Sequence, residues 1–361
     1  MGRRGPREQP RREHNPLHEE RLVRATRNQG VVMRSIRQCF MAVLVTASAA
    51  VQAAGYNVVN LTPAGASSAD AWDVNNLGQV VGSYSGAGFT YSRGYVWSAG
   101  VFTTLTGPAG ALSTNALGVS DAGAVVGAYV DTEVLDDTGT LVLGDSHGYI
   151  YEGGTYARID LPGAGSTTLR GISANGRYVS GYGSFADSSV RGFVLDRSSG
   201  AFTLVGSNVV GAFTIVQGIN NAGQLVGSEI VPVTGGPATR TSFIYDIGTG
   251  IRTDQNLPGV TTSFFRDIND AGQIAGFFRV PGSQQGFVGT PSSFEALAYG
   301  TLNDTILEGI NNSGWLVGRY LLDAAGNGQA ILLTPVPEPS IWLLSLAGFA
   351  VVGWQVRRRR G

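Results

Sequence analysis

The sequence predicts an all-β protein made of six four-stranded repeats, and a six-bladed β-propeller is the architecture that fits it best. Three observations lead to this prediction. A short segment recurs six times, Gly-aromatic strands recur with it, and no amphipathic pattern of three helical turns appears in residues 54–334. Glycine accounts for 53 of the 361 residues, about twice its ordinary share of about 7%, which is typical of a turn-rich chain. A β-solenoid and a pair of stacked β-sandwiches remain as alternatives.

Residues 33–53 carry the pattern of a secretory signal peptide. Arg34 and Arg37 precede an apolar run over residues 40–50, and small residues follow this run. We therefore expect signal peptidase to cleave between Ala53 and Ala54. The apolar run is too short for a membrane span, which needs about 20 residues.

Residues 1–32 precede this signal peptide and hold eight Arg and four Glu. A transit peptide would also be rich in Arg, but it would be poor in acidic residues. We therefore expect translation to start at Met33, so that residues 1–32 are a non-native upstream extension or a disordered stretch.

The repeated segment consists of an apolar pair, a turn that begins with Asn or Ser, a Gly within the turn, and a second apolar pair followed by Gly. The six copies occupy residues 73–82, 118–127, 171–181, 218–227, 267–276 and 309–318. Asn and Ser start turns by hydrogen bonding their own backbone, and Gly adopts the positive φ that closes a hairpin. The segment is therefore predicted to be a β-hairpin, and its Asn is expected to be structural rather than a ligand.

Two further strands complete each repeat. One carries Gly followed by an aromatic residue, as in residues 94–97, and the other is a short strand that precedes the hairpin, as in residues 102–108. Four strands in a unit of about 40–50 residues are typical of a propeller blade. We expect the strands at residues 56–61 and 330–334 to complete the closure of the ring.

The repeated segment resembles the signature of the HAF family of extracellular repeats, a Gly-Ile-Asn-x-x-Gly-x-Val-Val-Gly-like sequence. The second and third copies depart from it, because Ser120 and Ser173 replace the Asn. The resemblance covers most of residues 56–334 and implies an extracellular location rather than an activity.

The C-terminal residues 335–361 combine three features in a fixed order. A Pro-Glu-Pro motif comes first, an apolar run over residues 341–356 follows, and a cluster of arginines comes last. The motif residues are Val336, Pro337, Glu338, Pro339 and Ser340, and the arginines are Arg357, Arg358, Arg359 and Arg360. Because basic residues stay in the cytoplasm, this pattern predicts a transmembrane helix with the preceding domain outside.

This tail resembles the PEP-CTERM sorting tail of Gram-negative bacteria. The resemblance implies an inner-membrane intermediate, recognition by an exosortase that cuts near the motif, and delivery to the cell surface or the extracellular space. Such proteins often belong to exopolysaccharide or biofilm systems. A permanent tail anchor is the alternative.

Insertions collect in the connection between each hairpin and the next aromatic strand, which predicts a binding face on that side. The longest insertion, residues 131–146, contains five acidic residues: Asp131, Glu133, Asp136, Asp137 and Asp145. Carboxylates of this kind can bind Ca²⁺, but the spacing of a preformed calcium loop is missing. A solvated hairpin tip is the alternative.

The composition argues against several functions. Residues 54–340 hold 11 Arg against 22 Asp and Glu, so a nucleic-acid partner is not expected. The only Cys, Cys39, lies in the signal peptide, and residues 54–361 contain one His, His147. The carboxylates of Asp267 and Asp270 could serve a glycosidase, but other copies hold Gly and Asn at these turn positions. No catalytic residue, metal site or cofactor is therefore predicted.

Together these features predict an exported, non-enzymatic surface protein that is structural or binds a surface polysaccharide or protein. Signal peptidase, the exosortase and the membrane are its expected partners during export. The alternative is an extracellular polysaccharide-acting hydrolase or lyase, which needs an acid and a base converging at one end of the central channel.

Overall fold

The computed structural model describes residues 55–136, 138, 140–299, 304–321 and 327–336, and these residues form strands and turns without a helix. The all-β prediction is therefore confirmed for this part of the chain. Within it, no helix is long and apolar enough to cross a membrane. The predicted upstream stretch, signal peptide and membrane segment at residues 341–356 lie outside the described residues.

Four sheets contain four strands each. The first consists of β2 (Ala66–Val74), β3 (Val80–Gly86), β4 (Phe89–Ser98) and β5 (Val101–Leu105). The second consists of β6 (Ser113–Val119), β7 (Val125–Val130), β10 (His147–Glu152) and β11 (Thr155–Ile159). Another consists of β20 (Ser263–Ile268), β21 (Ile274–Val280), β22 (Ser283–Thr290) and β23 (Ser293–Leu297). The last consists of β24 (Thr305–Ile310), β25 (Leu316–Leu321), β26 (Gly328–Pro335) and β1 (Tyr56–Asn60).

The third and fourth repeats share one eight-stranded sheet. The third repeat supplies β12 (Ser166–Ile172), β13 (Tyr178–Ser184), β14 (Val190–Asp196) and β15 (Ala201–Val205). The fourth supplies β16 (Phe213–Ile219), β17 (Gln224–Val231), β18 (Thr239–Asp246) and β19 (Arg252–Asp254). A single parallel pair, Val190 with Phe213, joins the two sets. The prediction of six separate sheets was therefore wrong: the described residues form four four-stranded blades and one fused sheet.

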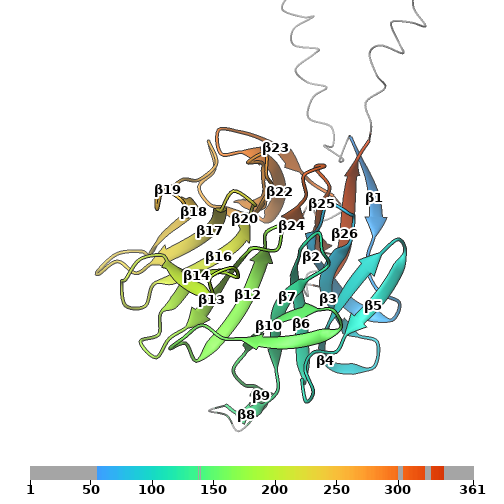
Figure 1. Ribbon diagram of the computed structural model, residues 1–361. Helices are drawn as coiled ribbons and strands as arrows, with labels where there is room; N and C mark the ends of the chain where they lie inside the picture. Colours follow the sequence, from blue (N-terminus) through green and yellow to red (C-terminus); the bar gives the residue numbers. More distant parts are fainter. Residues whose placement is uncertain (1–54, 137, 139, 300–303, 322–326, 337–361) are drawn as a thin grey trace, which may run out of the picture. The chain divides into compact units, whose positions relative to one another are not determined.

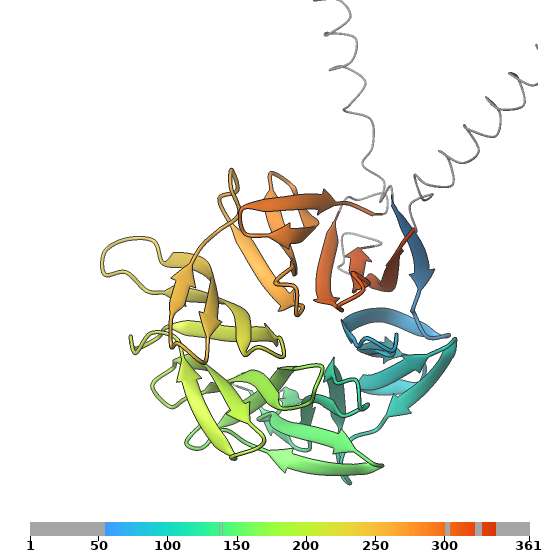
Figure 2. The same ribbon diagram turned by 45° about the horizontal axis from the view of Figure 1, so that its top comes forward.

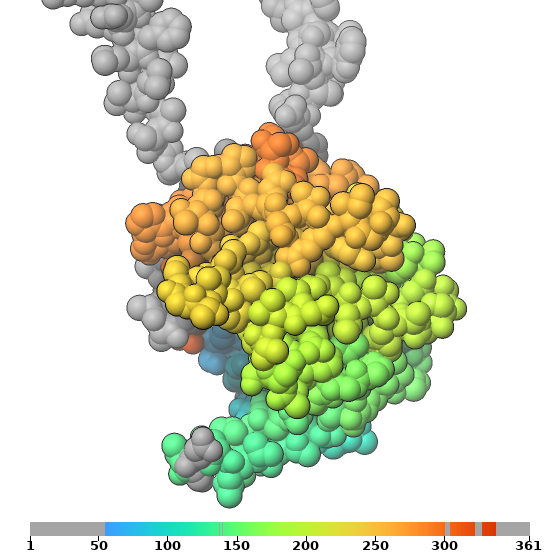
Figure 3. Space-filling model, turned by 90° about the vertical axis from the view of Figure 1, so that its left-hand side faces the viewer, coloured from blue at the N-terminus to red at the C-terminus, as the bar shows by residue number. Residues whose placement is uncertain are grey.

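The sheets follow one another in a propeller-like arrangement (Figures 1 and 2). A central pocket is lined by residues from β2, β6, β12, β16, β20 and β24 and from the turns that follow them. These six are the inner strands, and the pocket they surround is called the channel core below. The insertion between β7 and β10 forms a separate hairpin of β8 (Glu133–Leu135) and β9 (Leu141–Leu143), which projects from the sheets (Figures 1 and 3).

The last sheet is completed by the strand that comes first in the chain. Strand β1 pairs antiparallel with β26, from Tyr56 opposite Pro335 to Asn60 opposite Ile331. The backbone N–H of Leu61 continues the pairing by donating to the Ala330 carbonyl at 2.8 Å. The predicted pairing of the two terminal strands is therefore confirmed.

Each repeated segment forms the predicted hairpin between the first two strands of its repeat. In the first copy, Asn75 Oδ1 accepts the backbone N–H of Gln79 at 2.9 Å. The hydroxyls of Ser120 and Ser173 accept the equivalent N–H groups at 3.1 and 3.0 Å. The Gly within each of the six turns has a φ between 73° and 82°. The chain therefore uses Asn or Ser to start the turn and Gly to close it.

A glycine packed against a buried side chain of the third strand lies in every repeat. The last Gly of the repeated segment stands directly opposite that side chain in the pairs Gly82–Tyr95, Gly127–Tyr149, Gly181–Phe193, Gly227–Phe243, Gly276–Phe287 and Gly318–Ile331. All six partners are 0–1% exposed. A Cβ at Gly82 would lie 2.1 Å from the Asp70 carbonyl oxygen and 2.4 Å from the Tyr95 ring. The recurring Gly therefore makes room for the recurring large side chain.

Candidate ligand site in the central channel

All six inner strands bulge at the same place. The register of each strand against its neighbour shifts directly before or at the start of the repeated segment. The residues at these bulges are Trp72, Leu117, Arg170, Gln217, Arg266 and Glu308, and all six line the channel core. Bulges re-aim side chains and are common next to functional sites. The same bulge in every repeat therefore places one side chain against the channel core, and the type of this side chain varies between repeats.

Arg170 is the most connected of these bulge residues. Its Nε donates to Gln217 Oε1 at 2.6 Å, and its Nη2 donates to Glu308 Oε2 at 3.2 Å. The guanidinium carbon lies 4.4 Å from the ring centroid of Trp72, in cation–π contact. No hydrogen bond from Nη1 is formed within the described part of the chain, so this nitrogen is available to a ligand.

Arg266 is held less completely. Its Nε lies 3.4 Å from Glu308 Oε2, but that nitrogen is buried without a hydrogen-bond acceptor among the described residues. Burial, which removes the charge from water, lowers the pKa of Arg266, and the negative charge of Glu308 opposes this shift. Arg170 and Arg266 thus share one carboxylate, and Glu308 itself is only 2% exposed.

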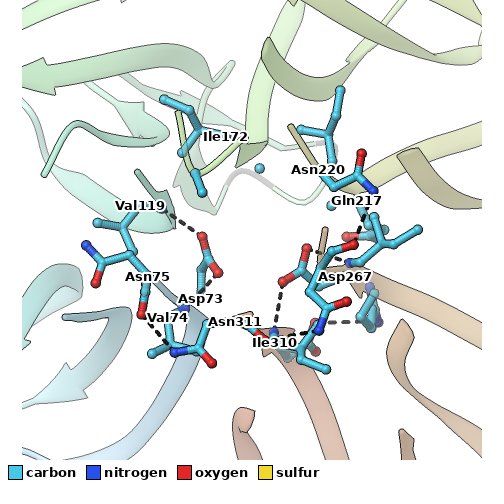
Figure 4. A pocket seen from close by; sticks show the side chains of 18 of the residues that line it. Asp73, Val74, Asn75, Val119, Ile172, Gln217, Asn220, Asp267, Ile310 and Asn311 are labelled. Carbon is cyan, nitrogen blue, oxygen red and sulfur yellow. Dashed lines mark hydrogen bonds and ion pairs between the residues drawn. The ribbon is translucent and has the colours of Figure 1, made fainter. Parts of the chain in front are cut away.

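Two carboxylates lie one residue further along the inner strands. At this position four repeats have Gly, but the first and fifth have Asp73 and Asp267. Asp73 accepts the backbone N–H of Val74 at 2.7 Å and, from the next repeat, that of Val119 at 2.8 Å. Asp267 binds its neighbours in the same way. Figure 4 shows both carboxylates pointing into the channel core.

Burial dominates the protonation of this pair. Burial raises the pKa of Asp73 to about 7, although the two backbone N–H groups oppose the shift. For Asp267, burial and then the negative charge of Asp73 raise the pKa well above its usual value. Such a pair can act as acid and base, but the channel core has a volume of only about 50 Å³. That volume admits a few water molecules and no sugar ring.

A network of hydrogen bonds between successive turns surrounds one end of the channel core. Side-chain Nδ2 groups of four Asn residues donate to the backbone carbonyl of the next turn, in the pairs Asn75–Ser120, Asn220–Asn269, Asn269–Asn311 and Asn311–Asn75, at 2.9–3.1 Å. The last pair joins the final repeat to the first. The predicted structural role of this Asn agrees with these contacts.

A second cavity of about 270 Å³, called the wide-end cavity below, is lined by residues of the second and third repeats and by Trp72. It shares Trp72, Leu117 and Arg170 with the channel core. The other lining residues are Ser113, Asn115, Ala128, Tyr129, Val130, Ser146, Thr168 and Tyr182. Val130 directly precedes the long insertion and Ser146 is its last residue, so this cavity lies on the side where the insertions predicted a binding face.

The acidic residues of the insertion turn toward different partners. Glu133 accepts a hydrogen bond from the Tyr91 hydroxyl, Asp136 accepts the backbone N–H of Thr138, and Asp145 accepts from the Ser166 hydroxyl. Asp131 lies 3.9 Å from His147, and Asp137 lies outside the described residues. In the part of the chain that is described, no three acidic, His or Cys side chains gather as metal ligands.

The remaining sequence-predicted residues have these positions. His147 Nδ1 lies 3.3 Å from Asp160 Oδ2, and the His147 ring lies 5.5 Å from the Tyr129 ring, in keeping with a structural role. Asp267 and Asp270 both line the channel core. Asp267 faces Asp73 (Figure 4), whereas Asp270 accepts hydrogen bonds from Asn221 and Asn312. The cleavage site, residues 337–340 and the arginine cluster lie outside the described residues. Val336 is described, and its N–H donates to the Gly55 carbonyl at 2.6 Å.

The bulge residues were not predicted as site residues from the sequence. The signal was present, because the residue before or at the start of each copy is Trp, Leu, Arg, Gln, Arg or Glu in an otherwise repeated frame. Variation at one position of a constant repeat is the pattern expected of a site that binds something asymmetric.

Comparison with known proteins identifies the C-terminal tail. A family model described as the PEP-CTERM protein-sorting motif matches residues 335–360. A search of curated protein sequences finds no match. This chain is therefore an exosortase-sorted extracellular protein on a β-propeller scaffold. The sorting tail implies export to the cell surface through a membrane-anchored intermediate.

Several solved structures resemble the fold at low sequence identity. TolB from Acinetobacter baumannii is 12% identical with a TM-score of 0.44, over 76% of this chain and 65% of TolB. Trypanosoma rangeli sialidase is 8% identical with a TM-score of 0.47, over 84% of this chain and 62% of the sialidase. The β-propeller domain of the Trilobed protease from Pyrococcus furiosus is 10% identical with a TM-score of 0.40, over 73% and 95%. The chain thus spans less than two thirds of TolB, and these likenesses concern the fold alone.

Proposed function

We propose that this protein is a non-enzymatic surface module that binds the end of a carbohydrate chain in its wide-end cavity. The observation that carries the proposal is the composition of this cavity. Trp72, Tyr129 and Tyr182 supply aromatic surface, and small hydroxyl and amide side chains stand between them. Sugar rings present apolar C–H faces and hydroxyl edges, so they match a lining of this kind.

The size of the cavity supports a chain end rather than an internal stretch. Ligand pockets usually measure about 300–1,000 Å³, and the wide-end cavity is close to the lower limit at about 270 Å³. The channel core, with which it shares three lining residues, has a volume of only about 50 Å³, so a sugar chain cannot continue into it. A terminal sugar residue is therefore the part that fits.

A second candidate is a polysaccharide-acting enzyme that uses Asp73 and Asp267 as acid and base. Their convergence and raised pKa values favour it. The non-enzymatic proposal is preferred because each carboxylate already accepts backbone N–H groups from two repeats. The narrow space around them also leaves no room for a glycosidic bond.

We further propose that the exosortase removes the tail near the motif and that the released protein works in an exopolysaccharide or biofilm matrix. The match over residues 335–360 supports this processing. Intact mass of the protein recovered from host membranes and culture fluid tests it. A species beginning at Ala54 and ending near Ser340 is expected, and a membrane species retaining Arg357–Arg360 would make the tail a permanent anchor. The HAF resemblance of the repeats stays a prediction.

Calorimetry with surface oligosaccharides tests the binding proposal on the exported protein. Tyr182→Ala, which removes an aromatic wall of the cavity, should weaken binding at least about tenfold. Tyr178→Ala is the matched control, because Tyr178 lies on the same strand but lines neither the channel core nor the wide-end cavity. Equal binding by both variants, or shortening of the oligosaccharide during the titration, would contradict the proposal.

A further inference from the structure

We propose that the bound chain end is acidic, and that Arg170 recognises its carboxylate at the floor of the wide-end cavity. This inference rests on the proposed function, because it names the class of sugar that the same cavity takes. The ligand class is an oligosaccharide that ends in a hexuronic acid.

The position of Arg170 supports this inference. Arg170 lines both the wide-end cavity and the channel core, so the two spaces meet at this residue. Its Nε and Nη2 are engaged by Gln217 and Glu308, and Trp72 covers one face. These contacts fix the orientation of the group and leave Nη1 without a partner in the described part of the chain. A fixed guanidinium with a free N–H edge is suited to bind a carboxylate.

The charge of the neighbouring side chains also supports this inference. Glu308 is the carboxylate shared by Arg170 and Arg266, so this cluster has one more positive than negative charge. The other charged pair beside it, Asp70 with Arg319, is balanced within itself. Asp73 and Asp267 also line the channel core, and the positive charge of Arg170 lowers the pKa of each. Burial outweighs this effect and raises both pKa values, which favours the neutral, protonated carboxyl groups. A single negative charge on the ligand would balance the cluster.

Arg266 has a buried N–H group that lacks a hydrogen-bond partner. Arg266 Nε is buried without an acceptor, and no hydrogen bond from this guanidinium to another described residue is formed. A buried donor without a hydrogen-bond partner destabilises the folded protein, and more so when the donor is charged. An anion bound to Arg170 would also be attracted by the positive charge of Arg266. Arg266 would stabilise this anion without contacting it.

The lining of the wide-end cavity also supports this inference. The wide-end cavity offers hydroxyl and amide groups from Ser113, Asn115, Ser146 and Thr168, which suit sugar hydroxyls. No acidic side chain lines this cavity among the described residues, so an incoming carboxylate meets no like charge there. The combination favours an acidic sugar over a phosphate monoester, which carries about −1.5 to −2 charge at pH 7 and thus more than the cluster can balance.

The test compares oligohexuronates with their methyl esters, using the exported protein. The two probes have the same sugars and differ at the carboxyl group, which in the ester is uncharged and larger by one methyl group. The acid should bind at least about tenfold more tightly than the ester. Arg170→Met should remove the preference, so that the acid binds no more tightly than the ester. Arg177→Met is the matched control, since it removes the same charge from an exposed ion pair with Asp196 and should leave the preference intact.

The outcomes separate this inference from the proposed function. Equal binding of acid and ester by the unchanged protein would overturn the inference and leave the proposed function standing. Binding of neither form, nor of any neutral oligosaccharide, would overturn both. The comparison of acid and ester needs no variant, so it decides the matter even if Arg170→Met fails to fold. In that case Arg170→Lys, which keeps the charge but loses the planar fork, should retain a reduced preference for the acid.

Discussion

Asp73 and Asp267 connect neighbouring repeats from inside the channel. Elsewhere this position is Gly, and a Cβ at Gly218 would lie 2.0 Å from Asp267 Oδ1. Neighbouring inner strands are therefore too close for side chains at every repeat. The two Asp carboxylates occupy the space that the glycines leave free and hydrogen bond across it. These hydrogen bonds require the burial of two carboxyl groups, and the stability of the domain therefore depends on pH.

Stability should fall as the pH rises from 5 to 8. The pKa of Asp73 is raised to about 7 in the folded protein, whereas an unfolded Asp titrates near about 3.9. The folded state then binds more protons than the unfolded state over this range, so the free energy of unfolding decreases with pH. We expect a loss on the order of 1–3 kcal/mol, measured by denaturant titration at each pH.

The variant Asp73→Asn/Asp267→Asn should flatten this dependence. Asp196→Asn is the control, because hydrogen bonds from Arg177 and Ser198 lower the pKa of Asp196. Its contribution is present above the unfolded pKa and is lost only in stronger acid. An unchanged slope in the double variant would contradict the assignment to Asp73 and Asp267.

Sequence reasoning predicted the residues of the turns but not the side chains that line the channel core. The turn roles of Asn, Ser and Gly follow from local chemistry, so the sequence predicted them. The channel side chains depend on a bulge, which adds one residue to a strand and cannot be recognised from apolar alternation alone. Asp267 was considered with Asp270, its neighbour in sequence, whereas its partner in space is Asp73, almost two hundred residues away.

Each repeat is held together by one close contact between its second and third strands. In five repeats the Gly of the second strand lets an aromatic ring lie across the backbone of the first strand, and in the sixth its partner is Ile331. Tyr95 even donates its hydroxyl to the Asp70 carbonyl at 3.1 Å. The hairpins and aromatic strands were predictable because both carry local signals. The fusion of the third and fourth repeats was not, because it depends on a single parallel pair between Val190 and Phe213.

Gly227→Ala should destabilise the domain by about 2–3 kcal/mol through overpacking. The new methyl group would lie 2.4 Å from the Ile215 carbonyl oxygen and 2.6 Å from the Phe243 ring. Gly236→Ala is the matched control in the same repeat, since its nearest neighbour would be 3.6 Å away. Thermal unfolding of both variants measures the difference. Equal midpoints would mean that the close contact is not what selects Gly.

Closure of the ring unites the two ends of the domain. Strand β1 follows the predicted signal-peptidase site, and β26 directly precedes the sorting motif. Their pairing brings Gly55 and Val336 within one hydrogen bond of each other. Gly55 and Val336, the first and last described residues, therefore lie at the same edge of the domain. An exosortase cut after Val336 would release the tail without removing a strand.

Val58→Asp should weaken this closure. Val58 packs against the buried cluster that includes Leu316 and Leu333, so a charge there would be buried. We expect a loss of about 2–4 kcal/mol and an increased sensitivity of residues 328–335 to hydrogen exchange. Val59→Asp is the control, because Val59 is 38% exposed on the other face of β1. Faster exchange in both variants, or in neither, would argue against β1 as the closing strand.

All six repeats contribute to the channel, but the side chains that line it differ from one repeat to the next. A crystal structure of the exported protein with an acidic oligosaccharide tests this account most directly. We predict the terminal sugar in the wide-end cavity, with its carboxylate at Arg170 and its ring among Trp72, Tyr129 and Tyr182. A sugar bound elsewhere, for example in the cavity of about 600 Å³ lined by Ile150, Leu195 and Phe202, would contradict the assignment of the channel as the ligand site.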